Sequence, residues 1–307
     1  MTRVIVIGGA NVDIKGRPHG SYIHATSNPG EVIHSPGGVG RNIAENLAHL
    51  GLAVSLVTVL GDDANGQFLR NACMAAGVDL ALAVTAPEPT GTYLAVLDQA
   101  GEMLGAVSDM RGMARLQPDQ LAALSHHLRA ADMLVADCNI PLACLAWLAE
   151  FADANGLRLV IDPVSVAKAE KLMQAVQYAP VFAITPNAPQ ATALTGTSGE
   201  AALLALHARG FANIVMHRGG AGALAYDGER LASIDAVHMG NIADVTGAGD
   251  AAVAGLVCGL LDGFDLVTAA RLGQCAAAFK LSSPQSVAVG LTRARLHHLA
   301  GIEKESP

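Results

Sequence analysis

The residues best suited to chemistry lie in the string Thr246-Gly247-Ala248-Gly249-Asp250, directly before an apolar run that ends at Leu261. Two glycines allow a tight turn with exposed backbone amides, and the first turn of a following helix carries partial positive charge. Such a turn binds a phosphate group or stabilises developing negative charge. A carboxylate there can take a proton from an attacking hydroxyl group. The string predicts phosphoryl transfer, although an ordinary glycine turn with an acidic helix cap has the same pattern.

Three further segments place glycines beside polar side chains. One follows the first predicted strand, where a carboxylate can accept two hydrogen bonds from a vicinal diol. A second opens a predicted helix with an amide side chain suited to a sugar hydroxyl. A third places an arginine before glycines, which would suit nucleotide phosphates but is a weak signal alone. Each is also compatible with a simple turn or helix start. Their residues are Asn11 and Asp13; Gly37, Gly38 and Asn42; and Arg218, Gly219, Gly220 and Gly222.

The elements that position these segments alternate along the chain. Short apolar runs predict buried parallel strands at Val4–Ile7, Val54–Val59, Met133–Ala136, Leu159–Ile161, Phe182–Ile184 and Ile214–Met216. Amphipathic or alanine-rich stretches predict helices at 41–50, 64–76, 118–130, 141–155, 168–178 and 199–209. This alternation predicts a doubly wound, mainly parallel α/β sheet flanked by helices, with ligands at the carboxyl ends of its strands.

Two regions, about residues 13–36 and 90–112, interrupt the alternation. The first is rich in Gly, Pro, Ser and His, and the second has two apolar runs separated by a turn at Gly101, as in a β-hairpin. We expect them to form a small β lid within a single domain spanning residues 1–307. The run Tyr93–Leu97 is apolar on both faces, so the lid needs a second cover, which a homodimer through the lid would supply.

Composition limits the partners. The net charge is -8 and the Lys and Arg residues are scattered, which argues against nucleic acid because that binding needs a concentrated basic face. The 5 cysteines include no CxxC pair, so neither a disulfide framework nor a zinc site is expected. The longest apolar run, 251–261, is about half a membrane span, and the start of the chain lacks a signal-peptide core. We expect a soluble, cytoplasmic protein.

Taken in order, these segments resemble the ribokinase-like (PfkB) carbohydrate kinase family. The glycine pair within 37–44 and the segment 244–250 are similar to its two signatures, and the resemblance covers essentially the whole chain. It implies the ribokinase-like fold, ATP with Mg²⁺, and transfer of phosphate to a sugar hydroxyl. Within the family, the strings at 27–30, 36–42, 101–103, 136–140 and 162–168 are most similar to kinases of pseudouridine, which implies phosphorylation of that nucleoside at its 5′-hydroxyl.

The resemblance also implies roles for single residues. Asp250 would activate the hydroxyl, and the amides of Gly247, Ala248 and Gly249 would hold the transferring phosphoryl group. The residues implied to bind the nucleoside are Asn11, Asp13, Gly37, Gly38, Asn42, Asn139 and Lys168. Those implied to bind the nucleotide are Asn187, Arg218, Gly219, Gly220, Gly222 and Thr246. Asp244 and Thr246 match the place where relatives hold a monovalent cation, so K⁺ is a further expected ligand, with residues near 282–286 completing its site.

One position departs from the family pattern. Where the family has Asn-x-x-Glu in support of magnesium and phosphate, this chain has Asn187-Ala188-Pro189-Gln190. A neutral amide does not attract hydrated magnesium as a carboxylate does. Two alternatives therefore stay open: a kinase for another nucleoside or sugar of the family, and a catalytically weakened nucleoside-binding protein. An NAD-binding oxidoreductase and a P-loop NTPase are excluded, because neither GxGxxG nor GxxxxGK[ST] occurs.

Overall fold

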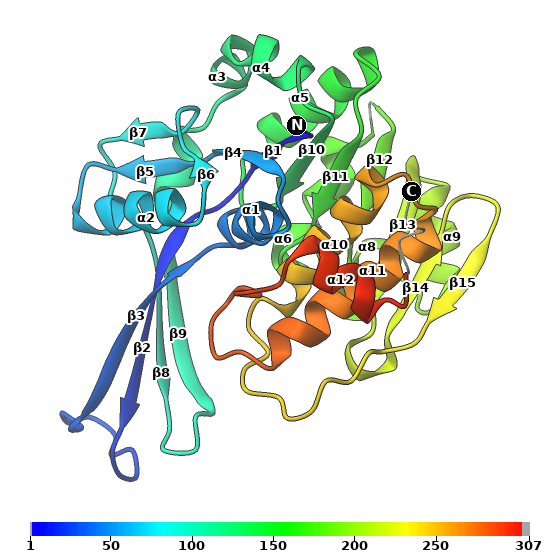
Figure 1. The fold of residues 1–307 in the computed structure, drawn as a ribbon. Coiled ribbons are helices and arrows are strands. Elements are labelled where there is room, and N and C mark those ends of the chain that lie inside the picture. The colour runs from blue at the N-terminus through cyan, green and yellow to red at the C-terminus, as the bar shows by residue number, and fades with distance from the viewer. Residues whose placement is uncertain (1, 178, 303–307) are drawn as a thin grey trace.

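The computed structural model describes residues 2–177 and 179–302 and is built around one twisted sheet (Figure 1). Its strand order is β15-β14-β13-β12-β11-β10-β1-β4-β6, and it is parallel from β13 to β6. The strands are β1 (Arg3–Ile7), β4 (Ala53–Val57), β6 (Val78–Asp79), β10 (Met133–Asp137), β11 (Leu159–Asp162), β12 (Val181–Ile184), β13 (Phe211–His217), β14 (Ala223–Tyr226) and β15 (Leu231–Ile234). The prediction of a mainly parallel α/β sheet is confirmed.

Helices cover both faces of the sheet, and strand β1 shows why its run is continuously apolar. Val4 and Val6 pack into one core cluster, whereas Ile5 and Ile7 pack into the other. The first core lies against α1 (Val39–His49), α10 (Ala248–Leu261), α11 (Leu266–Leu281) and α12 (Arg293–Leu299). The second lies against α3 (Pro118–Ala123), α4 (Ser125–Arg129), α5 (Leu142–Ala154), α6 (Val166–Ala169), α7 (Leu172–Ala175), α8 (Ala188–Thr195) and α9 (Glu200–His207). Burial on both faces is typical of parallel sheets.

Helix α10, which begins at the predicted catalytic residue, packs unusually closely on α11. A Cβ atom at Gly255 would lie 2.7 Å from the Leu272 carbonyl oxygen, and one at Gly259 would lie 2.8 Å from the Cα of Ala269. Both distances are below any real Cβ contact, so these positions need glycine. The close packing sets the direction of α10 and therefore the place where its first turn meets the sheet.

A second, four-stranded sheet projects from the body of the molecule, at the lower left of Figure 1. Its strands, in the order β3-β2-β8-β9, are β3 (Gly30–Gly37), β2 (Asn11–Pro18), β8 (Gly91–Leu97) and β9 (Met103–Asp109). We call it the lid sheet. It comes from the two regions that interrupted the sequence alternation, and helix α2 (Ala64–Ala75) packs at its base through Leu69. Its role in covering a substrate stays a prediction.

Several elements differ from their predicted bounds. The run 54–59 divides into β4 and β5 (Val59–Gly61), and β5 pairs with β7 (Val84–Ala86) in a separate two-stranded sheet. The stretch 118–130 divides into α3 and α4, and 168–178 into α6 and α7, with residue 178 outside the described part. The antiparallel strands β14 and β15 were not predicted. No described helix combines the length and apolar character needed to cross a membrane.

Candidate active site

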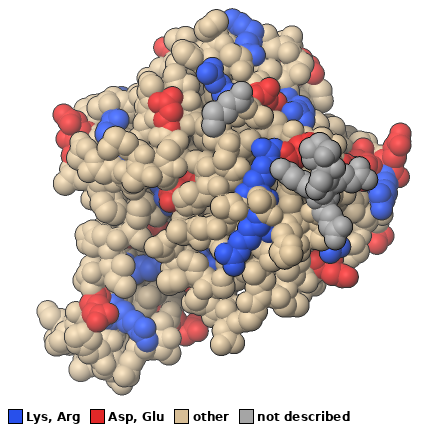
Figure 2. Space-filling model, in the orientation of Figure 1, with Lys and Arg blue, Asp and Glu red and all other residues tan. Residues whose placement is uncertain are grey.

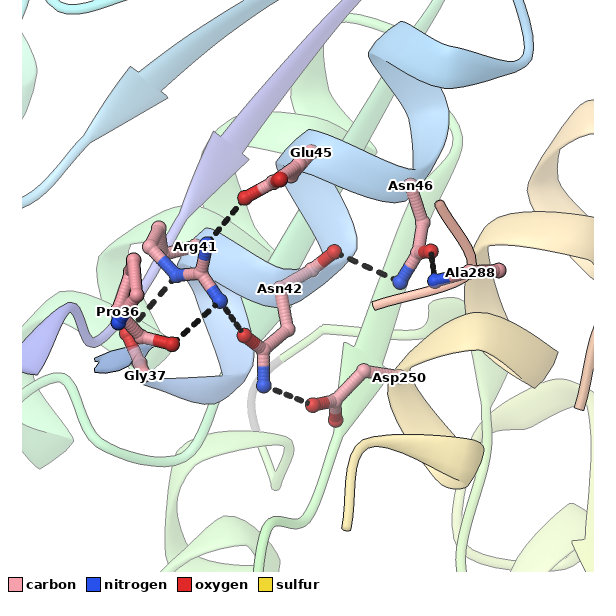
Figure 3. A network of polar contacts seen from close by, with 8 residues as sticks. All are labelled: Pro36, Gly37, Arg41, Asn42, Glu45, Asn46, Asp250 and Ala288. Atoms are coloured by element: carbon pink, nitrogen blue, oxygen red, sulfur yellow. Dashed lines mark hydrogen bonds and ion pairs between the residues drawn. The ribbon is translucent and has the colours of Figure 1, made fainter. Parts of the chain in front are cut away.

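The predicted catalytic base, Asp250, is buried in the first turn of α10, with 8% of its surface exposed. Its Oδ2 accepts a hydrogen bond of 2.6 Å from Nδ2 of Asn42 on α1 (Figure 3). The sequence separation is 208 residues, so the fold brings together the two segments that the sequence singled out most strongly. The carboxylate thus lies beside an amide that belongs to the predicted sugar-binding helix start.

The environment of Asp250 suits a base that works near neutral pH. Burial raises its pKa to about 8, the neighbouring carboxylate of Asp162 acts in the same direction, and the hydrogen bond from Asn42 opposes them. Burial likewise raises the pKa of Asp162, at the end of β11, to about 7. Effective proton transfer needs a base whose pKa lies close to the working pH. Asp250 meets that condition, whereas an exposed aspartate does not.

The residues before Asp250, 244–249, form a tight turn that we call the glycine loop. Gly247 has φ 81°, and a Cβ there would lie 1.9 Å from the carbonyl oxygen of Ser286. Only glycine fits both demands. A Cβ at Gly249 would meet nothing within 4 Å, so the space in front of it is open. Of the three predicted anion-hole amides, that of Ala248 donates a long bond of 3.3 Å to the Val245 carbonyl.

Arg41 fixes the orientation of Asn42, a role the sequence did not reveal. The residue is 1% exposed, and its guanidinium donates to the carbonyls of Gly37 (3.1 Å) and Pro36 (2.9 Å), to Glu45, and to Oδ1 of Asn42. With its oxygen held by Arg41, the Asn42 amide must present its NH₂ group to Asp250 (Figure 3). A charged residue on a buried helix face is the signal that could have identified it.

Asp13 and Asn11 lie together at the start of β2, where Asn11 Nδ2 donates to Asp13 Oδ1 at 2.6 Å. Burial raises the pKa of Asp13, and the bond from Asn11 opposes this. A Cβ at Gly37 would lie 2.4 Å from the Asp13 carboxyl, and one at Gly38, which has φ 97°, would lie 2.5 Å from the Gly9 carbonyl oxygen. The two predicted glycines therefore make room for the strand end that carries the polar pair.

Asp137, at the end of β10, is a second residue that the sequence did not single out. It is fully buried, and its Oδ2 accepts from the amides of Gly9 (2.9 Å) and Gly40 (2.7 Å) and from Nδ2 of Asn139 (3.0 Å). Its Oδ1 accepts from the Asn139 amide at 2.8 Å. Lys168 donates in turn to Oδ1 of Asn139. One carboxylate thus holds the loops after β1 and β10 and the start of α1 in place.

The predicted nucleotide-binding residues lie at the next strands of the sheet. Asn187 and Gln190 form a capping box on α8: the Asn187 side chain accepts from the Gln190 amide at 2.9 Å, and Gln190 Oε1 accepts from the Asn187 amide at 2.8 Å. Gln190 therefore has a structural task that a glutamate could also perform. The departure from the family pattern leaves the helix start intact.

Arg218 follows β13 and is turned toward the edge of the sheet. It donates to Oγ of Ser233 at 2.9 Å and to the Ala223 carbonyl at 3.3 Å, and its Nε has no partner among the described residues. Gly219 and Gly220 border open space, whereas a Cβ at Gly222 would lie 2.0 Å from the Ile234 carbonyl. No hydrogen bond joins these described residues to Asp250 or Asn42, and their binding of nucleotide phosphates stays a prediction.

The predicted cation residues sit in the glycine loop itself. The amide of Thr246 donates to Oδ1 of Asp244 at 2.8 Å. Burial acts to raise the pKa of Asp244, but hydrogen bonds from Thr246 and the charges of Lys15 and Lys280 outweigh it and leave that pKa lowered. No cluster of three or more His, Cys, Asp or Glu residues that could hold a metal ion occurs within 2–177 and 179–302.

The chain is similar over its whole length to known kinases. Residues 1–291 match the family model described as pfkB family carbohydrate kinase. The pseudouridine kinase of Escherichia coli K12 is 36% identical over 286 residues, which cover 91% of this chain and 90% of that protein. An uncharacterized sugar kinase of the same organism, YeiI, is 32% identical, with coverages of 91% and 78%.

Solved structures agree with this relationship. A carbohydrate kinase from Agrobacterium tumefaciens has a TM-score of 0.87 and 29% identity over 98% of both chains. The Arabidopsis thaliana ribokinase complexed with ribose and ATP has a TM-score of 0.84 over 100% of both chains, and at 21% identity it supports the ribokinase-like fold. Kinases of this family are phosphotransferases that act on hydroxyl groups. The chain belongs to the pfkB family of carbohydrate kinases.

Proposed function

We propose that the chain transfers the γ-phosphoryl group of ATP to the 5′-hydroxyl of pseudouridine, with Asp250 as the catalytic base. The observation that carries this proposal is the buried Asp250 carboxylate, held by Asn42 at 2.6 Å behind the glycine loop. The 36% identity to the Escherichia coli pseudouridine kinase supports the choice of acceptor. The Arabidopsis ribokinase complexed with ribose and ATP supports the choice of donor.

The reaction follows from the geometry of the proposed groups. Asp250 takes the proton of the 5′-hydroxyl as its oxygen attacks the γ-phosphorus, and the bond to the β-phosphate oxygen breaks to release ADP. The first turn of α10 would offer backbone N–H donors to the transferred phosphoryl group, and the open space at Gly249 leaves room for that group. These donors would reduce the free-energy cost of its negative charge. The bond from Asn42 orients the carboxylate toward the incoming hydroxyl.

Nucleoside selection is assigned to the two polar clusters at the strand ends. The Asn11–Asp13 pair would bind the ribose diol, since a carboxylate accepts two hydrogen bonds. The Asn139–Lys168 pair would bind the edge of the base. Pseudouridine has a ring N–H where uridine has its glycosidic nitrogen, and a pocket that bonds to this group rejects an analogue that lacks it.

Magnesium would enter with ATP. The described residues contain no dedicated metal cluster, and the oxygen of Gln190 is bound to the Asn187 amide. Asp162 lies near Asp250, but its two oxygens already accept from the Val164 amide at 2.7 Å and from the Thr185 hydroxyl at 3.2 Å. When bound, magnesium would neutralise charge on the β- and γ-phosphates. Gln190 caps α8 as a glutamate would, and magnesium that arrives bound to ATP would make a carboxylate at this position dispensable.

The lid sheet would cover the nucleoside and join two copies of the chain. Its outer strands expose Val32 (65%), Ile33 (57%), Met103 (60%) and Val107 (66%). This part of the surface, at the lower left of Figure 2, is mostly uncharged, with one small acidic group beside one small basic group. A lid-to-lid homodimer would bury the apolar side chains.

A cytoplasmic location fits the unpaired, buried state of the cysteines at 73, 138, 144, 258 and 275.

A panel of acceptors tests the proposal. Purified protein is incubated with ATP, Mg²⁺ and, separately, pseudouridine, uridine, adenosine, inosine or ribose, and ADP release is followed. We expect the largest kcat/KM for pseudouridine and a product that carries phosphate on the 5′-oxygen. ADP release that is greater with ribose or another nucleoside would reject the acceptor while retaining the kinase.

A further inference from the structure

The segments expected to hold a monovalent cation do meet in space. Ser286 packs its carbonyl against Gly247 of the glycine loop, and the Ala243 amide donates to the Leu281 carbonyl at 2.8 Å. The loop after α11 therefore lies on the residues that precede Asp250. Whether a cation fits depends on which oxygen atoms remain free there, since K⁺ and Na⁺ bind through oxygen ligands.

Lys280 already provides a positive charge at this place. It is the residue before the last of α11, its side chain is 0% exposed, and its Nζ donates to the backbone carbonyl of Asp244 at 2.6 Å. A buried lysine needs a specific partner, because an isolated ammonium group is costly to remove from water. Burial lowers the pKa of Lys280, and the carboxylates of Asp244 and Asp250 oppose that shift.

The other oxygens of Asp244 are also engaged by donors. Its Oδ1 accepts from the Thr246 amide at 2.8 Å, and its Oδ2 pairs with the Nζ of Lys15 at 3.4 Å. Asp244, the charged residue expected to bind a cation, thus faces two ammonium groups and the Thr246 amide, an arrangement that repels a cation.

We propose that the ammonium group of Lys280 takes the place of the monovalent cation, so that this kinase holds its glycine loop with a tethered charge and needs no K⁺. The lysine belongs to α11 and the bound carbonyl begins the glycine loop, so the pair ties α11 to the loop that precedes Asp250. The expected effect on turnover rests on the proposed phosphoryl transfer. The expectation that the protein binds no monovalent cation at this place does not.

The first test uses the unmodified protein at constant ionic strength in potassium, sodium or choline chloride. Turnover of pseudouridine and the melting temperature are measured in each salt. We expect turnover to agree within about twofold and the melting temperature to show no rise specific to potassium. Severalfold activation by potassium over choline, or a potassium-specific rise in melting temperature, would overturn the proposal.

The second test compares Lys280→Met with Lys171→Met. Lys171 is a matched control, because its Nζ also donates to a backbone carbonyl, that of Ile140, at 2.6 Å, and burial also lowers its pKa. In choline chloride we expect Lys280→Met to lose roughly tenfold or more in kcat, as removal of a fixed charge near developing negative charge does, and to recover with K⁺ or NH₄⁺. Lys171→Met should remain insensitive to the cation.

The outcomes separate the possible explanations. Full turnover of Lys280→Met in choline, or a loss of turnover that no cation restores, would mean that Lys280 serves packing alone. Either result would overturn the proposal that Lys280 replaces a monovalent cation. If Lys280→Met does not fold, the salt series on the unmodified protein decides the question. If no acceptor is turned over in any salt, the proposed function fails, and the melting temperatures still test whether a cation binds.

Discussion

The main sheet around Asp250 and the lid sheet differ in what they bury: the first buries charged side chains, and the second exposes apolar ones. Around Asp250, carboxylates are buried, and each described hydrogen bond to Asp137 comes from this chain's own amides. In the lid sheet, strand β9 is exposed along Met103–Ser108, and no residue within 2–177 or 179–302 covers its apolar side chains. The polar groups of the first region find partners within the chain. The second region leaves its apolar side chains exposed, which is the basis of the proposed dimer.

The largest expected effect is on catalysis, through Asp250→Asn. Loss of a general base lowers kcat by roughly 10² or more, while the fold and nucleotide binding persist because an amide can still accept from Asn42. Steady-state kinetics with a parallel measurement of nucleotide affinity check this. The matched control is Asp265→Asn, an acidic cap of α11 that accepts from the Thr268 amide at 2.7 Å and that asparagine replaces well. Near-normal turnover in Asp250→Asn would exclude its role as base.

Asp250→Asn should also change how the stability of the protein depends on pH. The folded-state pKa of Asp250 is raised from 3.8 to about 8, so the folded state holds its proton more strongly. Stability is therefore lost as the pH rises through this interval, and the neutral asparagine removes that loss. Asp250→Asn should raise the melting temperature relative to the unmodified protein more at about pH 9 than at about pH 5. An equal difference at both pH values would mean that Asp250 titrates normally.

A smaller effect is expected from Gly247→Ala in the glycine loop. The new Cβ meets the Ser286 carbonyl at 1.9 Å and must adopt φ near 81°, so the loop has to move away from the first turn of α10. We expect turnover to fall by roughly tenfold and stability to fall by more than about 1 kcal/mol. Gly263→Ala is the control, since it has φ 87° with nothing within 4 Å and isolates the conformational cost. Equal melting temperatures for the two variants would contradict the close contact.

A shift in the pH profile is expected from Asp162→Asn. Its carboxylate helps to raise the pKa of Asp250, so the neutral amide should lower that pKa. Because the base works deprotonated, the rising limb of kcat/KM should move to lower pH by about one unit. Asp153→Asn, an exposed residue on α5, should leave the profile unchanged. A limb that stays in place would show that another group controls it.

The smallest effect on turnover is expected from changes in the lid sheet. Val107→Lys places a charge on strand β9, where Val107 pairs with Leu94, and should dissociate the proposed dimer while turnover changes by less than about tenfold. Light scattering across a concentration series gives the mass of each species. Val289→Lys, an exposed apolar residue outside the lid sheet, is the control and should remain dimeric. A strictly monomeric unmodified protein would remove the basis for this prediction.

Features encoded by short patterns were predictable from the sequence. The apolar runs of β1, β10, β11, β12 and β13, and the glycine loop before α10, depend on neighbours in the chain. The roles of Arg41, Asp137 and Lys280 were not predicted, because each depends on contacts between distant segments. Asp137 binds amides 128 and 97 residues away, and no local pattern marks a carboxylate for that task. The capping box Asn187–Gln190 is local and could have been recognised from its spacing.

The central claim is that this site phosphorylates pseudouridine by means of Asp250, and competition between two isomers tests it most directly. Pseudouridine and uridine are offered together with ATP and Mg²⁺, and both 5′-phosphates are quantified by mass spectrometry after chromatographic separation. We expect pseudouridine 5′-phosphate to exceed uridine 5′-phosphate by at least about tenfold, because the base pocket bonds to the additional ring N–H. Equal amounts of both products, or an excess of uridine 5′-phosphate, would contradict the claim.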